Sequence, residues 1–365
     1  MSNATSDAPS FNFAATPLSP TPSTVEAFTF TGRGSEYFRI WIVNILLSIV
    51  TLGIYSAWAK VRRNRYFYDN TSVAGSSFEY HGNPIAILKG RIIAAVLIGG
   101  YQVAIRTNPK IGLLVLIPLM AAMPWLVWRS YQFKLYNSSY RGIRFGFKGS
   151  AGQSYFNYLL LPVLSGLSLG LLLPFAHQRT KKYLHSESKF GATHFSFDAS
   201  IGAFYKIYAI CFVIGMLGFI GLGIIFGGSL VALGTAGKHA GPAGFSGPFF
   251  LMIFAMYAWM FLIIPLGLTM VQNLIWSSTK LGEHQFQSNL KWTKVFFIMI
   301  TNLIAIVCTL GLFTPFAHIR ALKYRLESVT LLTAGSLDNF IADAEPHGSA
   351  AGEGMSDLLD FDLSL

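Results

Sequence analysis

Seven long apolar runs, separated by shorter polar stretches, dominate the pattern along this chain of 365 residues. The runs cover approximately residues 37–55, 89–106, 111–129, 155–173, 204–228, 249–275 and 295–313. A helix of about 20 apolar residues spans the roughly 30 Å hydrocarbon layer of a membrane. The pattern therefore predicts an all-α polytopic membrane protein rather than a soluble domain with a large core.

Three of these runs, 37–55, 155–173 and 295–313, end in the same motif. The copies read Gly-Ile-Tyr-Ser-Ala-Trp-Ala-Lys-Val-Arg from residue 53, Gly-Leu-Leu-Leu-Pro-Phe-Ala-His-Gln-Arg from residue 170, and Gly-Leu-Phe-Thr-Pro-Phe-Ala-His-Ile-Arg from residue 311. Recurrence at a fixed register indicates repeated structural units. We expect three tandem repeats, with copies at about residues 28–90, 145–207 and 286–330.

Each copy has the composition of a turn between two helices. Gly53, Gly170 and Gly311 suit the left-handed conformation that ends a helix. We expect Ser56 and Thr314 to cap the next helix. Pro174 and Pro315 suit its first turn, where a missing N–H costs nothing. The helix after the turn carries basic residues on one side, which is typical of a segment lying among lipid head groups.

Charge discriminates between two membrane topologies. If all seven runs crossed, the 27 Lys and Arg residues would divide almost evenly between the two sides. If the three motif-bearing runs return to the face that they enter, only Arg106, Lys110 and Lys238 lie outside. The positive-inside rule favours this scheme. We expect four crossing helices, three re-entrant or broken helical hairpins, and both termini in the cytosol. Length alone leaves open whether the three motif-bearing runs cross or re-enter.

Short segments with alternating aromatic residues flank the hairpins. They lie at residues 28–32, 77–82, 143–147 and 193–197. Aromatic residues recur at matching positions of the copies. Phe28, Phe145 and Phe286 align at the start of the three copies. After the first two hairpins, Phe78 aligns with Phe195 and Tyr80 aligns with Phe197. Alternation bounded by glycines predicts strands. Strands on either side of one hairpin pair only if both its ends lie on one face, so we expect a small cytosolic β-strand layer.

Composition separates the chain ends from the membrane body. Residues 1–25 are rich in Ser, Thr, Pro and Ala, and residues 333–365 are acidic without any Lys or Arg. We expect both to be disordered tails, which leaves a single integral membrane domain at 26–332. The positive charge of that domain fits the positive-inside rule, so we expect membrane lipids and no nucleic acid as partners. Cys211 and Cys308 lie in apolar runs at no metal-site spacing, so we expect no metal and no cofactor.

The chain resembles a known family between about residues 26 and 330. The residues that carry the resemblance are Phe28, the first motif copy, the Phe-Glu-Tyr-His-Gly segment from residue 78, and the two Pro-Phe-Ala-His copies. Together they resemble the YjgN family of bacterial inner-membrane proteins, whose function is uncharacterised. The resemblance implies a multi-pass protein of the bacterial inner membrane, and it implies no reaction.

Polar residues that align at the start of each return helix are candidate ligands for an anion. The aligned sets are Lys60, His177 and His318; Arg62, Arg179 and Arg320; and Tyr66, Tyr183 and Tyr324. Arginines near one axis could hold phosphate oxygens, and basic cytosolic pockets bind anionic lipid head groups. Interfacial anchoring explains the same residues without a ligand. We expect a non-enzymatic protein that binds anionic lipid head groups, or an unknown protein partner, through this basic hairpin cluster.

Amides inside the apolar runs suggest an alternative. Asn44 and Asn302 match in the first and third copies, and Asn157 lies near the start of the second hairpin. They serve either as hydrogen bonds between helices or as the lining of a path for a small solute, as in a transporter or channel. An intramembrane enzyme is the remaining alternative. The crossing runs carry no acidic residue, and we expect no catalytic residues.

Overall fold

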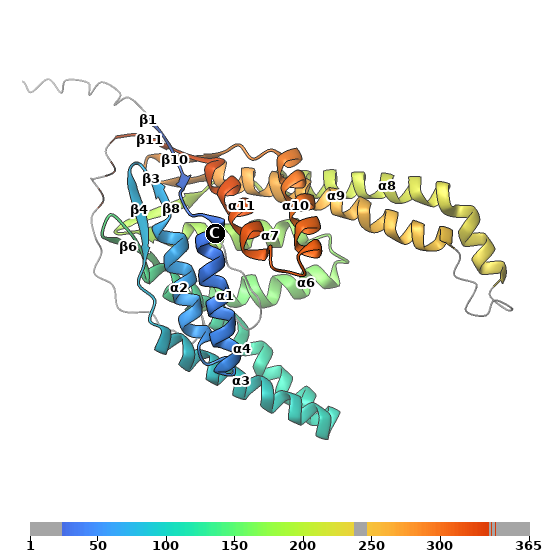
Figure 1. Cartoon of the computed structure of the whole chain (residues 1–365), viewed down its shortest axis with the longest axis horizontal. Coiled ribbons are helices and arrows are strands. Elements are labelled where there is room, and N and C mark those ends of the chain that lie inside the picture. Colours follow the sequence, from blue (N-terminus) through green and yellow to red (C-terminus); the bar gives the residue numbers. More distant parts are fainter. Residues whose placement is uncertain (1–23, 237–246, 336, 338–339, 341–365) are drawn as a thin grey trace, which may run out of the picture.

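The computed structural model describes residues 24–236, 247–335, 337 and 340, in which strands alternate with pairs of helices (Figure 1). The strands are β1 (Thr24–Ala27), β2 (Thr29–Phe30), β3 (Thr71–Val73), β4 (Ser76–Tyr80), β5 (Ser138–Tyr140), β6 (Ile143–Phe147), β7 (Ser188–Phe190), β8 (Thr193–Phe197), β9 (Thr279–Leu281), β10 (His284–Ser288) and β11 (Val329–Thr333). The helices are α1 (Gly34–Val50), α2 (Ser56–Asp69), α3 (Pro84–Thr107), α4 (Pro109–Tyr136), α5 (Ala151–Tyr155), α6 (Leu161–Leu167), α7 (Leu173–Ser186), α8 (Ile201–Ala236), α9 (Gly247–Ser277), α10 (Trp292–Cys308) and α11 (Thr314–Glu327), and a π-helical turn η1 (Phe156–Leu160) joins α5 to α6. The tails expected at 1–25 and 333–365 lie largely outside the described residues.

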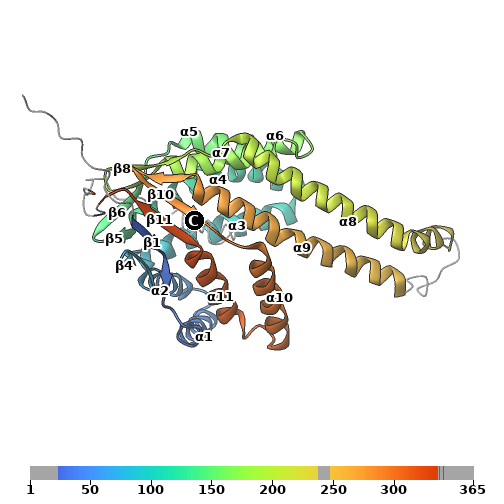
Figure 2. The ribbon, with the colours of Figure 1, turned by 90° about the horizontal axis from the view of Figure 1, so that it is seen from above.

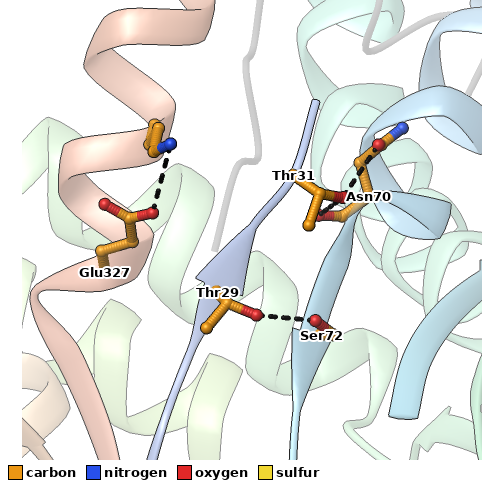
Figure 3. A network of polar contacts seen from close by, with 6 residues as sticks. Thr29, Thr31, Asn70, Ser72 and Glu327 are labelled. Carbon is orange, nitrogen blue, oxygen red and sulfur yellow. Dashed lines mark hydrogen bonds and ion pairs between the residues drawn. The ribbon is translucent and has the colours of Figure 1, made fainter. Parts of the chain in front are cut away.

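The strands form one antiparallel sheet of eleven strands in the order β1-β11-β10-β9-β8-β7-β6-β5-β4-β3-β2. Since only Phe28 separates β1 from β2, the two edges of the sheet are one stretch of chain, and the sheet is nearly closed into a barrel. At the edge of the sheet where β2 pairs with β3, the Thr29 and Ser72 hydroxyls lie 2.7 Å apart, and the Thr31 hydroxyl donates to Asn70 Oδ1 at 3.1 Å (Figure 3). The prediction of a purely α protein with a small strand layer is therefore incomplete, because the strands form a barrel.

Aromatic side chains fill the barrel. Five phenylalanines form a ring with neighbouring centroids 6.2 to 6.5 Å apart: Phe28, Phe78, Phe145, Phe195 and Phe286. A second group of buried residues packs against them: Val73, Tyr140, Phe190, Leu281 and Leu331. The barrel is thus a packed core like that of a small closed barrel, and side chains occupy its axis.

Five helical hairpins leave the barrel and return to it at the same end. In each case the last residue of one strand and the first residue of the next are register partners in the sheet. These partners are Phe30 and Thr71, Tyr80 and Ser138, Phe147 and Ser188, Phe197 and Thr279, and Ser288 and Val329. Paired strands thus clamp the base of every hairpin, and the three motif copies occupy three of the five.

Two of the hairpins are long, and three are short. Among the residues that the structure describes, four helices are long and apolar enough to cross a membrane: α3, α4, α8 and α9. This finding confirms the prediction of four candidate spans and a mostly helical fold. The α3–α4 and α8–α9 pairs extend away from the barrel and diverge from each other (Figures 1 and 2). The α1–α2, α5–α7 and α10–α11 hairpins are shorter.

The short hairpins turn through the same backbone conformation. Gly53, Gly170 and Gly311 have φ angles of 90°, 87° and 91°, as their position predicts, and the leucine before each glycine is also left-handed. A hydroxyl side chain two residues before the glycine closes each turn. This residue is Thr51, Ser168 or Thr309, and its hydroxyl accepts the backbone N–H of the residue four positions later in the chain. The prediction that Ser56 and Thr314 cap the next helix is wrong, because their hydroxyls donate back to the glycine carbonyls.

Candidate functional site

A cavity of about 610 Å³ opens between α1, α2, α3 and the first turns of α11. Its cationic side chains are Lys60 and Arg63 of α2 and Arg91 of α3, and His318 of α11 lies beside them. Its remaining lining is apolar or uncharged: Tyr37, Trp41, Asn44, Ile45, Ser48, Ile49, Ser56, Ala59, Thr314 and Pro315. We call this cavity the basic groove.

Helical periodicity explains why these residues share one surface. Ser56, Ala59, Lys60 and Arg63 recur at the spacing that places side chains on one face of α2. The groove side of α1 repeats at the same period and is largely apolar. The α3 wall is fixed to the turn of the first hairpin, because Arg91 Nη1 donates to Ser56 Oγ. The wall formed by α2 and α3 is therefore basic, and the wall formed by α1 is largely apolar.

The described lining of the groove contains more basic than acidic side chains. None of the described residues that line it is Asp or Glu, while three are Lys or Arg. Cations gathered in a partly enclosed site raise the local concentration of anions and strengthen charge-assisted hydrogen bonds to them. The groove therefore favours an anionic ligand.

Asn44 supplies a further polar atom at the groove. Its side chain is 8% exposed, and its Nδ2 donates to the Ala59 carbonyl at 3.4 Å, while Oδ1 has no hydrogen-bond partner. At the matching position of α10, Asn302 bonds the Ala317 carbonyl at 3.0 Å, and its Oδ1 accepts from Arg320 Nη1 at 2.8 Å. The buried Asn44 Oδ1 atom of the first hairpin thus lacks the hydrogen bond that Arg320 donates to the matching Asn302 oxygen in the last hairpin.

The structure brings only part of the aligned basic set together. Lys60 and His318 line the basic groove. His177 lies elsewhere, with its Nδ1 3.0 Å from the Tyr208 hydroxyl. Arg62 is exposed outside the groove, and Arg179 is exposed with its guanidinium over the Phe175 ring. The Nη2 atom of Arg320 reaches the Thr301 hydroxyl at 3.2 Å, so the three aligned arginines do not share one pocket.

The aligned tyrosines close the bases of their hairpins. The Tyr66 hydroxyl accepts the N–H of Arg33, the residue before α1, at 2.8 Å. The Tyr183 hydroxyl donates to the carbonyl of Ser150, the residue before α5, at 3.1 Å. The Tyr324 hydroxyl accepts the N–H at the corresponding position before α10, at 3.0 Å. In each hairpin the tyrosine thus ties the end of the second helix to the start of the first.

Two further expectations concern the amides and the metal-binding residues. Asn157 donates to the Gln153 carbonyl of its own helical segment at 2.7 Å. Within the described part of the chain, no group of three or more His, Cys, Asp or Glu residues is placed to hold a metal ion. Cys211 and Cys308 are free thiols.

Sequence reasoning missed Arg63 and Arg91 as groove residues. Repeat alignment drew attention to Arg62, whose neighbour Arg63 lies on the groove face of the helix. The signal for Arg91 was its position, because a basic residue in the second turn of a predicted span is unusual unless it faces a polar site. The helical period of α2 would have found Arg63.

The chain matches one protein family over most of its length and curated relatives over less than half of it. The family described as bacterial protein of unknown function (DUF898) matches residues 25–358. Two relatives are inner membrane protein YjgN of Salmonella typhimurium, 31% identical over 145 residues, and its namesake in Escherichia coli O157:H7, 30% identical over 168 residues. These alignments cover 40% and 44% of this chain, and 37% and 40% of the relatives. No solved structure matches. The chain belongs to the DUF898 family of bacterial proteins of unknown function, and it is a membrane protein distantly similar to inner membrane protein YjgN.

Proposed function

We propose that the barrel lies on the cytosolic side of the inner membrane, with α3, α4, α8 and α9 crossing and the three short hairpins re-entering. Two observations support this orientation. Every hairpin starts and ends at the same end of the barrel, and all Lys and Arg residues other than Arg106, Lys110 and Lys238 lie toward that end or in the barrel. Lys238 falls outside the described residues. Retention of cations on one face is the positive-inside pattern.

The tips of the short hairpins support re-entry. Leu52, Leu169 and Leu310 form the turns, and they are 94%, 93% and 95% exposed. Full exposure of a leucine to water forgoes about 1.5 to 3 kcal/mol of burial each, whereas lipid satisfies it. The turn of α3–α4 is instead polar, with Arg106 and Lys110 beside it. Apolar turns thus fit the hydrocarbon, and a polar turn fits the far surface.

We infer that the basic groove binds the head group of an anionic phospholipid. The observation that carries this function is the 610 Å³ cavity whose lining, as far as the structure describes it, holds Lys60, Arg63 and Arg91 and no Asp or Glu. A phosphate at the basic wall would accept from these cations, and an acyl chain would lie along the apolar α1 wall at Trp41 and Ile49. Basic pockets between helices on the cytosolic side recognise lipids in this way.

Quantitative lipid binding tests the function. Phosphatidylglycerol is titrated into the delipidated full chain in neutral detergent, and binding to the variant Lys60→Gln/Arg63→Gln is compared with wild type. Loss of two charge-assisted hydrogen bonds predicts an affinity reduced by at least about tenfold. The control Arg62→Gln/Arg65→Gln removes two exposed cations from the same helix outside the groove and retains wild-type affinity. Equal affinities of the two double variants would refute the proposal.

The transport alternative has less support. Asn44, Asn157 and Asn302 each donate to a backbone carbonyl within their own hairpin, and the barrel axis is filled by aromatic rings. Uptake of small solutes into proteoliposomes remains its test. That the chain catalyses no reaction stays an expectation from the sequence.

A further inference from the structure

The protein presents different cross-sections to the two leaflets. Five helical hairpins lie next to the barrel, and two of them, α3–α4 and α8–α9, contain the four helices long enough to continue to the far side. We propose that the chain is a membrane wedge, which concentrates in and stabilises membrane whose barrel-side leaflet is convex. This inference rests on the re-entrant arrangement proposed above, and it does not depend on the lipid-binding groove.

The helices of the short hairpins are shorter than the roughly 30 Å hydrocarbon layer, and their contacts with the long helices determine how deep they reach. Helices α1 and α10 have 17 residues each, and α2, α7 and α11 have 14. At about 1.5 Å per residue these helices are about 21 to 26 Å long, whereas α3 and α8 reach about 36 and 54 Å. Part of each short helix is occupied by its basic, head-group-facing portion. The remaining length does not cross the hydrocarbon layer.

Contacts with the long helices show how shallow the short tips are. Ser56, at the turn of the first hairpin, accepts from Arg91, which lies seven residues into α3 and therefore about 10 Å along it. The carbonyl of Leu171, at the tip of the second hairpin, accepts from the Tyr205 hydroxyl at 3.0 Å. Tyr205 lies four residues into α8, about 6 Å along it. Both tips are level with the first turns of the crossing helices, on the barrel side of the bilayer.

The resulting asymmetry is large. Three short hairpins add six helical arms to the barrel-side leaflet, and each arm with its side chains has a diameter of about 10 to 12 Å. Their combined cross-section is roughly 500 to 700 Å², and it increases as the hairpins incline toward the membrane plane. The far leaflet holds no counterpart among the described helices. Shallow apolar insertion of this kind is sensitive to membrane curvature.

The barrel keeps the asymmetry from relaxing. Each short hairpin is held at its base by paired strands and by its tyrosine, and it is also tied to a neighbouring long helix. The third hairpin is joined to α9 because Asn273 Nδ2 donates to the Leu290 carbonyl at 2.9 Å. The hairpins therefore cannot spread between the two leaflets. A rigid insert that occupies more area in one leaflet than in the other makes the leaflet with the larger area convex.

Sorting among vesicles of different diameter tests the proposal. A cysteine replaces the exposed barrel residue His194 in a Cys211→Ala/Cys308→Ala background, and the full chain is reconstituted into phosphatidylcholine vesicles of mixed size. An impermeant dye added outside labels only molecules whose barrel faces outward. The dye signal per unit of lipid is expected to rise severalfold from the largest to the smallest vesicles. Density independent of diameter would overturn the proposal.

Variants at the tips separate shape from folding. Asp is tolerated in the left-handed conformation, so Leu52→Asp/Leu169→Asp/Leu310→Asp keeps the turns while raising them out of the hydrocarbon. This variant is expected to lose the size dependence, and Thr107→Asp at the polar turn of α3–α4 is expected to keep it. If the triple variant does not fold, wild-type protein inserted with its barrel facing inward provides the test instead. The density of these molecules per unit of lipid must be higher in large vesicles than in small ones. Neutral lipid makes the outcome independent of the basic groove, so each proposal can fail alone.

Discussion

Removal of one ring from the barrel core gives the sharpest test of the fold. Phe286 is 6% exposed, and its ring lies 6.3 Å from Phe28, 6.2 Å from Phe195 and 5.4 Å from Trp276, measured between centroids. Phe286→Ala deletes these contacts and leaves a cavity in the barrel core between β8, β10 and Phe28, the residue that joins β1 to β2. Such truncations cost about 3 to 5 kcal/mol. At about 2 to 4 °C per kcal/mol for a domain of this size, we expect the Tm to fall by about 10 °C.

The assay is thermal unfolding of the detergent-purified full chain, read as the folded fraction that survives heating on a size-exclusion column. The control is Phe212→Ala on α8, a candidate membrane span, where the phenylalanine side chain is 67% exposed. A lipid-facing truncation removes little buried contact, so the control is expected to shift the Tm by less than about 3 °C. If both variants shifted the Tm equally, the barrel would not be the stabilising core of the molecule.

Three further outcomes follow from single contacts. Tyr324→Phe removes the acceptor for the N–H before α10 and is expected to cost about 1 kcal/mol, measured as a lowered Tm. Arg320→Gln leaves the buried Asn302 oxygen without its donor and is expected to cost about 1 to 3 kcal/mol, whereas Arg62→Gln at the matched exposed position leaves the Tm unchanged. Burial lowers the pKa of His185 to about 3, so below pH 6.5 the unfolded chain binds a proton that the folded chain does not. Stability is therefore expected to fall by about 2 kcal/mol from pH 7 to pH 5, and His185→Gln removes this part of the pH dependence.

The sequence predicted the elements well because local patterns determine them. Hydropathy located the four candidate spans, and alternating aromatics located strands beside the hairpins. All five phenylalanines of the ring stood in aligned positions of the sequence. Closure of the barrel was not predicted, because the pairing of β1 with β11 joins Thr24 to Thr333 across almost the whole chain. No local pattern reports such a contact.

The candidate site was predicted in part for a similar reason. Lys60, Asn44 and His318 were found from the repeat, and they do line the groove. Alignment treats the three hairpins as equivalent, whereas the basic groove lies at the first of them, where α3 supplies Arg91. A neighbour that comes from outside the repeated unit is invisible to comparison of the units. The helical period of α2 explains why Arg63, rather than Arg62, faces the cavity.

Sided labelling of single cysteines tests the central claim most directly, namely that every hairpin returns to the face it left. In the cysteine-free background, single cysteines are placed at His194 on the barrel and at Thr107 on the turn of α3–α4. An impermeant maleimide is then added to cells whose outer membrane alone has been opened. We predict that the Thr107 position is labelled at once and that the His194 position is labelled only after the inner membrane is broken. Labelling of the His194 position from the periplasm in cells with an intact inner membrane would contradict the account.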